Sequence, residues 1–348
     1  MNLTDPKFSR FSLVKEMLET PALVGSMEWN RAAAVSRRIM ELGRLFLTGE
    51  GSSRIFPAKN LICEILCQGI EVATATDGGR QASEYPLHDA VIFGASNSGR
   101  TKELVTLFRK LTDEGHRDRY GLTAASNSVL AESCEECFVL RCGKENAVAA
   151  TKSVVEQVLF YRSLLIPFEG EATSETEGGS PMVQNQVAAA KACEAVLTTD
   201  LCPELVKRIA AAGTICFAGR NNGVGEELTL KTNEITRKKS DFFEGTYSLH
   251  GVEEVLDATD VIVFIEPFEG DLDSIRKNLL EGVGMGVCAI ATKEIPEIPT
   301  IVIPSIAGYD TVLQLLAGWN LLVHVGVELG IDLDHPVRAR KVGNEVGA

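Results

Sequence analysis

Two glutamates, a lysine and a histidine lie within 24 positions of one another, at spacings that could support proton transfer. Glu227, Lys231 and Glu234 stand at i, i+4 and i+7, so their side chains would project from one face of a helix. His250 follows in a segment that leaves the helix through Gly245. Carboxylates and imidazoles are common general acids and bases. Spacing alone favours a plainer interpretation, a solvated helix whose Glu227–Lys231 pair contributes about 0.2–0.5 kcal/mol.

Two strand–turn–helix patterns precede this segment, and each turn is rich in glycine and hydroxyl side chains. The first runs from an apolar strand at 44–48 through the turn 49–54, and the second from a strand at 89–94 through the turn 95–101. Such a turn aims the amides at the start of a helix toward an anion. The candidate phosphate ligands are Ser52, Ser53, Ser96, Asn97, Ser98 and Thr101. A tight connection with one hydroxyl as a helix cap is the plainer alternative.

Neither turn matches a known nucleotide-binding motif. The glycines complete no G-x-G-x-x-G pattern, and no Gly-Lys-Ser/Thr of a P-loop is present. A dinucleotide-dependent dehydrogenase is therefore poorly supported. Cys134-x-x-Cys137 has no second paired motif beside it. We expect neither a cofactor nor a metal.

Composition narrows the class of protein further. The chain has 348 residues, of which 45% are hydrophobic and only 6% aromatic, which is typical of an aliphatic α/β core. A net charge of −14 argues against a nucleic-acid partner, and no apolar run reaches the ~18–20 residues of a membrane span. Nine cysteines, an odd number, and no hydrophobic signal region near Met1 indicate reduced thiols and a cytoplasmic protein.

The alternation of strands and helices predicts an α/β fold with two duplicated domains. A helical arm is expected at 1–40, a first domain at 41–168, a second domain at 185–330 and a polar tail at 331–348. The acidic, Gly/Ser/Thr-rich segment 169–184 is the predicted linker.

Taken together, residues from about 40 to 345 resemble the sugar isomerase (SIS) family. The first turn resembles the family's Cys-Gly-Thr-Ser, and the second resembles Ser-Gln-Ser-Gly-Glu-Thr, the phosphate loop. Val148–Lys152 resembles Val-Ala-Ser-Thr-Lys, with Ala150 where the family has serine. The segment from Glu227 resembles Glu-Gly-Ala-Leu-Lys-Leu-Lys-Glu-Ile, and it is most similar to the isomerase half of glutamine–fructose-6-phosphate amidotransferases.

This resemblance implies a fold of two tandem SIS-type domains, each a parallel sheet flanked by helices in a flavodoxin-like three-layer arrangement. It implies that Glu234 moves a proton between C1 and C2 of a sugar and that His250 opens the sugar ring. Lys341 would lie over the sugar and could form an imine, in a tail where Val337 replaces the family's arginine. Glu227 and Lys231 would orient this set, or form a purely structural ion pair. Val148 and Ala150 would line the sugar, and the six residues of the two turns would hold its phosphate.

The implied activity is that of a phosphosugar isomerase on a 6-phosphosugar or an aminosugar 6-phosphate, with ammonia release if it resembles glucosamine-6-phosphate deaminases. A fructosamine-6-phosphate deglycase and a tagatose-6-phosphate ketose/aldose isomerase stay open, as does a non-catalytic phosphosugar sensor. The segment before Thr48 is too short for a glutaminase domain, so glutamine-dependent synthesis is not expected. Members of the family are commonly homodimers with shared active sites, and we expect His250 to serve the neighbouring subunit.

Overall fold

The computed structural model describes residues 1–166, 179–340 and 344–346. The chain divides into two compact units. The first-sheet unit comprises 22–145, 150–187 and 340–348, and the second-sheet unit comprises 1–21, 146–149 and 188–339. The predicted linker lies mostly outside the described residues, and its last four residues begin helix α11 (Pro181–Thr198).

The first-sheet unit holds a five-stranded parallel sheet in the order β2-β1-β3-β4-β5. Its strands are β1 (Arg44–Gly49), β2 (Ala73–Asp77), β3 (Val91–Ala95), β4 (Arg119–Thr123) and β5 (Glu136–Val139). Its helices include α4 (Ala33–Leu42), α5 (Ile55–Gln68), α6 (Gly79–Ala82), α7 (Lys102–Asp113), α8 (Val129–Glu132) and α9 (Lys152–Ser163), and α3 (Thr20–Gly25) falls at the boundary between the units.

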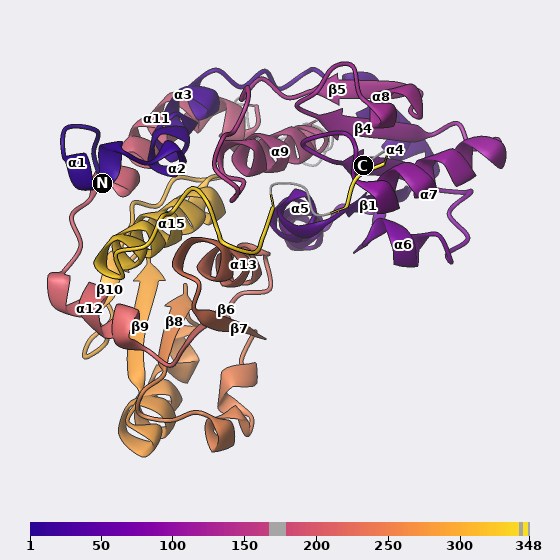
Figure 1. The fold of residues 1–348 in the computed structure, drawn as a ribbon. Helices are drawn as coiled ribbons and strands as arrows, with labels where there is room; N and C mark the ends of the chain where they lie inside the picture. The colour runs from indigo at the N-terminus through magenta and orange to yellow at the C-terminus, as the bar shows by residue number, and fades with distance from the viewer. Residues whose placement is uncertain (167–178, 341–343, 347–348) are drawn as a thin grey trace. The chain divides into compact units, whose positions relative to one another are not determined.

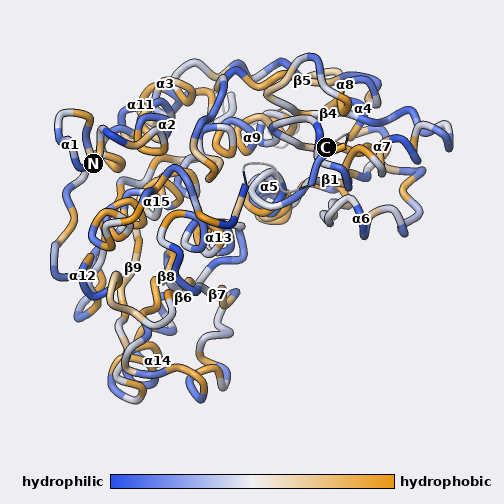
Figure 2. Tube along the Cα trace, in the orientation of Figure 1, coloured by the Kyte–Doolittle hydropathy of each residue, from blue (hydrophilic) through white to orange (hydrophobic). Residues whose placement is uncertain are grey.

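Helices cover both faces of this sheet, which explains why its central strands are apolar throughout. All five residues of β3 are buried, as expected for a strand enclosed on two sides. On one face, α7 packs Leu104 and Phe108 against Ile92. On the other, Phe93 meets Phe160 of α9 at 5.6 Å between ring centroids. Figure 2 shows hydrophobic and hydrophilic residues alternating along α7, consistent with one buried face.

The second-sheet unit repeats this topology, with strand order β10-β9-β8-β6-β7. Its strands are β6 (Thr214–Gly219), β7 (Lys239–Glu244), β8 (Val261–Ile265), β9 (Gly286–Ala291) and β10 (Thr300–Val302). Its helices are α1 (Pro6–Ser9), α2 (Ser12–Leu18), α12 (Pro203–Ala211), α13 (Val224–Thr236), α14 (Leu272–Ser274) and α15 (Asp310–Glu328), with the turns η2 (Tyr247–Leu249), η3 (Val252–Val255) and η4 (Glu269–Asp271) and the π-helical segment η5 (Ile275–Val283).

Within this unit, α13 and α15 lie beside each other against the sheet (Figure 1). Gly318 of α15 makes the close approach possible, because a Cβ there would overlap the side chain of Leu228. The opposite face of the sheet packs Ile262 and Phe264 against Ile275 and Leu279 of η5. Both sheets therefore have three layers and the strand order 2-1-3-4-5 of flavodoxin-like folds. The predicted fold class is confirmed.

Candidate active site

The strand order defines where each unit can bind a ligand. In a doubly wound sheet, ligands bind outside the carboxyl ends of the strands, where the chain switches direction across the sheet. In the first-sheet unit that point lies between β1 and β3, which pair in register with Gly49 opposite Ala95. Both hydroxyl-rich turns start there. An added Cβ on Gly49 would lie 2.8 Å from the carbonyl oxygen of Ala95, so the two turns leave the sheet in close contact.

The turn after β3 is organised by its own hydroxyls. Ser96 Oγ and Thr101 Oγ1 lie 2.8 Å apart, and Gly99 donates its N–H to Ser96 Oγ at 3.0 Å. Gly99 has φ +63°, and a Cβ on it would overlap Ser128, so only glycine fits. Thr101 occupies the N-cap position of α7, but its side chain makes no cap hydrogen bond. Its hydroxyl therefore does not act as the helix cap that the plainer alternative proposed. Ser98 Oγ accepts the N–H of Arg100 at 3.2 Å.

The turn after β1 is more enclosed. Ser52 is 8% exposed, and Ser53 Oγ lies 3.5 Å from Nε2 of Gln157 on α9. Asn97, in the other turn, donates Nδ2 to Glu145 at 3.0 Å. The structure therefore brings the two predicted turns side by side in one unit. It also commits the amide nitrogen of Asn97 to a protein acceptor, which the sequence did not indicate.

The last described residues of the chain contact the turn after β3 and the start of α7. Asn344 accepts the N–H of Lys102 at 3.1 Å through its carbonyl and donates Nδ2 to Glu103 at 2.6 Å. Val346 donates its N–H to the carbonyl of Arg100 at 3.0 Å. Lys341, the predicted imine-forming lysine, lies outside the described residues. The tail was predicted to serve the site, but its pairing with the turn after β3 was not.

In the second-sheet unit, α13 follows the switch-point strand β6 and carries the predicted acid–base set. Lys231 Nζ lies 3.2 Å from Glu227 Oε1 and 2.7 Å from Glu234 Oε2. The side chains of Glu227 and Lys231 have no exposed surface, whereas that of Glu234 is 25% exposed. The solvated helix face that spacing alone favoured is therefore wrong for this pair. Only the outer carboxylate, that of Glu234, reaches solvent.

The charge state of Lys231 follows from this environment. Burial by itself lowers the pKa of an ammonium, but the carboxylates of Glu234 and Glu227 outweigh it, and the pKa of Lys231 is raised above its ordinary value. Lys231 therefore stays a cation at neutral pH. This state suits a group that holds Glu234 in place and does not suit an amine nucleophile.

His250 lies on a loop tied to the same edge of the second sheet. The loop begins where Gly245 donates its N–H to the carbonyl of Gly219 at 2.6 Å, at the end of β6. His250 itself is exposed, and its Nε2 lies 3.2 Å from Thr246 Oγ1. The imidazole is thus accessible to a ligand or to another chain.

The predicted sugar-lining residues fall in different units. Val148 is half-buried in the second-sheet unit, where its N–H donates to the carbonyl of Asp334 at 3.1 Å. Glu16 of α2 accepts N–H groups of Asn146 and Ala147 in the same loop. Ala150 is half-buried in the first-sheet unit. The sequence interpretation missed Glu16, because it read the N-terminal helices only as a packing arm.

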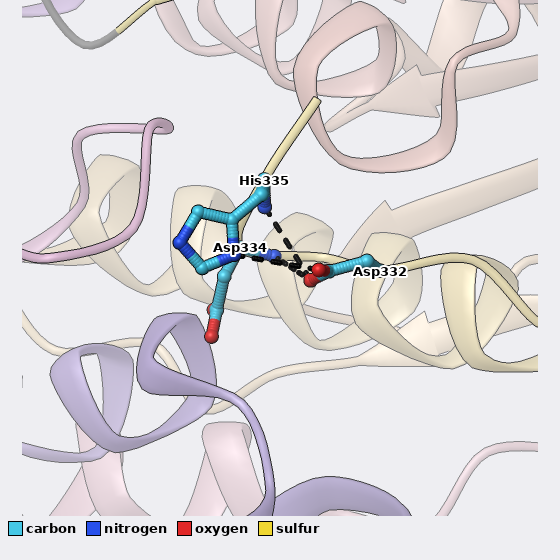
Figure 3. A group of neighbouring side chains, drawn as sticks. All are labelled: Asp332, Asp334 and His335. Atoms are coloured by element: carbon cyan, nitrogen blue, oxygen red, sulfur yellow. Dashed lines mark hydrogen bonds and ion pairs between the residues drawn. The ribbon is translucent and has the colours of Figure 1, made fainter. Parts of the chain in front are cut away.

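One group of side chains has spacing that could hold a metal ion. Single ligand atoms of Asp332, Asp334 and His335 lie within 4.8 Å of one another (Figure 3). The two oxygens of Asp334, however, accept the N–H groups of Ser12 and Leu13, each at 2.8 Å. Asp334 therefore caps the start of α2 from a position 322 residues away in the sequence.

The remaining four histidines differ in their surroundings. His324 packs edge-on against Phe8, with 4.9 Å between ring centroids. His335 and His88 are exposed. His116 lies in the loop between α7 and β4 but is only 7% exposed, and its Nε2 lies 3.1 Å from the carbonyl of Leu87. In the part of the chain that the structure describes, none of the helices combines the length and the hydrophobicity that a membrane span requires.

Comparison with known proteins finds a family model that matches part of the chain and relatives that match most of it. The family model of the SIS domain matches residues 85–167. The isomerizing glutamine–fructose-6-phosphate aminotransferase of Bradyrhizobium diazoefficiens is 24% identical over 362 residues, which cover 96% of this chain and 59% of that protein. The chain thus spans less than two thirds of that relative.

Solved structures extend the likeness across both units. The C-terminal domain of glucosamine-fructose-6-phosphate aminotransferase from Francisella tularensis has a TM-score of 0.74 at 17% identity, covering 94% of this chain and 98% of that one. Glucosamine-6-phosphate deaminase from Thermotoga maritima has a TM-score of 0.67 at 17% identity, covering 95% and 99%. The chain contains a SIS domain, has the tandem SIS fold, and is homologous to the isomerase half of glutamine–fructose-6-phosphate aminotransferases.

Proposed function

We propose that this chain is a phosphosugar isomerase that acts on a 6-phosphosugar or an aminosugar 6-phosphate. The observation that carries the proposal is the turn after β3, in which the hydroxyls of Ser96 and Thr101 lie 2.8 Å apart at the switch point of the first sheet and Gly99 holds the turn in shape. Hydroxyls and main-chain amides bind phosphate without a lysine. An acidic chain needs such local donors, because its overall field repels anions.

The buried ion-pair cluster on α13 supports the proposed chemistry. Glu234 is the partly exposed carboxylate of the cluster, held at 2.7 Å by a lysine that stays charged. In the proposed reaction, His250 transfers the proton that opens the sugar ring. Glu234 then takes the proton from C2 of the open-chain aldose and returns it at C1, while a proton moves from the C2 hydroxyl to the C1 oxygen, so that the carbonyl passes from C1 to C2. Lys341 would neutralise charge on the substrate or bond to its carbonyl.

With a 2-amino sugar, the same proton transfer gives an imine at C2. Water then adds to that carbon, ammonia leaves, and the product is the 2-ketose phosphate. The names of relatives include an isomerizing aminotransferase and a deaminase, which favours an aminosugar phosphate as substrate. Deglycation of a fructosamine 6-phosphate and isomerisation of tagatose 6-phosphate use the same two carbons and remain the alternatives.

A substrate panel tests this proposal. Glucosamine 6-phosphate, fructose 6-phosphate, tagatose 6-phosphate and a fructosamine 6-phosphate are incubated with the protein, and sugar products and ammonia are measured. We expect turnover of at least one, and loss of it in Glu234→Gln. Glu226→Gln, eight positions before Glu234 on α13, is the matched control and should stay active. Phosphosugar binding without turnover of any substrate would instead indicate the non-catalytic sensor.

We also propose that the chain acts as a homodimer in which His250 serves the partner's site. The exposure of His250 within its own unit supports this arrangement. Mixing His250→Ala and Glu234→Gln subunits should restore part of the activity. Hybrid dimers that form but stay inactive would contradict the sharing of sites.

A further inference from the structure

A buried carboxylate lies behind the turn that follows β3. Glu145 is 5% exposed and belongs to the same unit as that turn. Its Oε1 accepts the N–H of Thr151 at 2.7 Å and that of Ser153 at 3.3 Å. Its Oε2 accepts Ser153 Oγ at 2.7 Å and Asn97 Nδ2 at 3.0 Å. One side chain thus connects the turn to a different element.

That element is the start of α9, a helix in which every residue is buried. The N-cap residue, Thr151, has no side-chain cap bond to the helix. Glu145 supplies the cap instead, because its carboxylate accepts main-chain N–H groups at the positive end of the helix dipole. Because α9 packs on the sheet through Phe160, its start is a fixed reference point in this unit.

Asn97 is held at both ends by this arrangement. Its side chain donates to Glu145, and its carbonyl accepts the N–H of Ala124 at 3.1 Å and Thr123 Oγ1 at 3.3 Å. The hydrogen bond between Gly99 and Ser96 shapes the turn. Asn97 lies between these two residues, directly after Ser96. The bond to Glu145 therefore sets the direction of the amides and hydroxyls around it.

We propose that Glu145 is a positioning residue for phosphate binding. It holds the turn after β3 against the start of α9, so that the donors of the turn are aligned before the phosphate arrives. This inference rests on the proposed function, because it assumes that the turn binds the phosphate of the substrate. Glu145 does not take part in the proton transfer, so its loss should weaken binding and leave the chemical step nearly unchanged.

The acceptor oxygens of the Glu145 side chain are essential to this role. The donors that converge on its two oxygens include two main-chain N–H groups, a hydroxyl and an amide. A carboxylate accepts all of them, whereas the amide of glutamine has the same shape but presents two donors of its own. Glu145→Gln therefore breaks the connection without creating a cavity. Glu145→Asp keeps the charge but shortens the reach, and it is the second variant if the first folds poorly.

Glu156 provides a matched control within the same unit. It is 3% exposed, lies on α9 and accepts the main-chain N–H groups of Arg141 and Cys142 at 2.7 Å. It is therefore a buried carboxylate with a comparable structural role but no bond to the turn after β3. A merely structural requirement for a buried carboxylate would make Glu156→Gln and Glu145→Gln equivalent.

The test compares these variants in calorimetric binding of fructose 6-phosphate and glucosamine 6-phosphate, and in kcat and KM for any substrate that is turned over. Removing hydrogen bonds to a charged group should weaken binding about 10- to 100-fold in Glu145→Gln, with kcat changed less than about threefold. Glu156→Gln should bind as the wild type does. Because Glu145 acts through Asn97, the double variant Glu145→Gln/Asn97→Ala should bind the sugar phosphate no more weakly than whichever single variant has the lower affinity.

Equal affinities of Glu145→Gln and Glu156→Gln, or fully additive losses in the double variant, would overturn the positioning role while leaving the proposed function intact. A fall in kcat at unchanged affinity would overturn it as well, because Glu145 would then act on the chemical step. A wild-type protein that binds neither sugar phosphate nor inorganic phosphate would overturn the proposed function, and the positioning role with it.

Discussion

Replacing Lys231 with methionine removes the cation from a buried face of α13 while keeping a side chain of similar length. In the native structure its Nζ lies 3.2 Å from Glu227 and 2.7 Å from Glu234, and neither Lys231 nor Glu227 has exposed side-chain surface. Breaking a buried pair by removing one partner costs about 3–5 kcal/mol, because a buried charge is left uncompensated. For a unit of this size that loss corresponds to a fall in Tm of about 6–20 °C.

The loss should depend on pH in a direction that follows from Glu227. Without Lys231, burial raises the pKa of Glu227 above that of the unfolded chain, about 4.3. The variant is then least stable, relative to wild type, near pH 7, where the unfolded chain releases a proton that the folded variant retains. The difference in the free energy of unfolding should shrink as the pH falls toward and below about 4.3, because Glu227 is protonated in both states only below that pH.

Urea unfolding followed by circular dichroism measures this difference, and hydrogen exchange of α13 peptides locates it. Lys110→Met is the matched control, since Lys110 and Glu114 also pair at i, i+4, at 2.9 Å, but are about half exposed. Such a pair contributes about 0–1 kcal/mol. The double variant Lys231→Met/Glu227→Gln should recover much of the lost stability. If Lys231→Met costs no more than Lys110→Met, the argument from burial is wrong.

Three further outcomes are expected. Asp334→Ala should destabilise the protein by about 1–2 kcal/mol through loss of the cap on α2, and Asp332→Ala should not; equal losses would contradict the capping role. Because the pKa of Lys231 is raised on folding, its stabilising contribution should persist up to about pH 10.4 and decline as the pH rises further through the folded-state pKa. An alkaline unfolding series in which the stabilities of wild type and Lys231→Met decline in parallel would refute this. Burial raises the pKa of Cys216 to about 12, so iodoacetamide at pH 8 should label the exposed Cys202 and spare Cys216 in the folded protein. Mass spectrometry of the peptides measures the labelling, and equal labelling of the two cysteines would count against the buried position of Cys216.

The central strands could be predicted from the sequence, whereas two edge strands could not. The apolar run at 261–265 coincides with β8, and the run at 214–218 falls one residue short of β6. Strands β2 and β7 lie at the edges of their sheets, where much of their surface is exposed. Exposed edges tolerate polar residues, so Ala73–Asp77 and Lys239–Glu244 lack the continuous apolar pattern that marks a buried strand.

The candidate site shows the same division between local pattern and long-range contact. The hydroxyl-rich turns follow strands and precede helices, so their place at the sheet edge could be inferred from order alone. The burial of Glu227 and Lys231 could not, because it depends on α15, whose Gly318 lets the helix approach α13 closely. The roles of Glu145 and Glu16 likewise depend on partners brought together by the tertiary fold. In the sequence they are only two of 48 acidic residues.

Proton exchange at the substrate carbons tests the central claim most directly. Fructose 6-phosphate and glucosamine 6-phosphate are incubated with the protein in D2O, and deuterium at C1 and C2 is followed by NMR, which detects proton transfer whether or not ammonia leaves. We predict incorporation with the wild-type protein and a loss of at least about 100-fold in Glu234→Gln, as expected when a general base is removed. Absence of exchange with every 6-phosphosugar tested, or exchange at the wild-type rate in Glu234→Gln, would contradict the account.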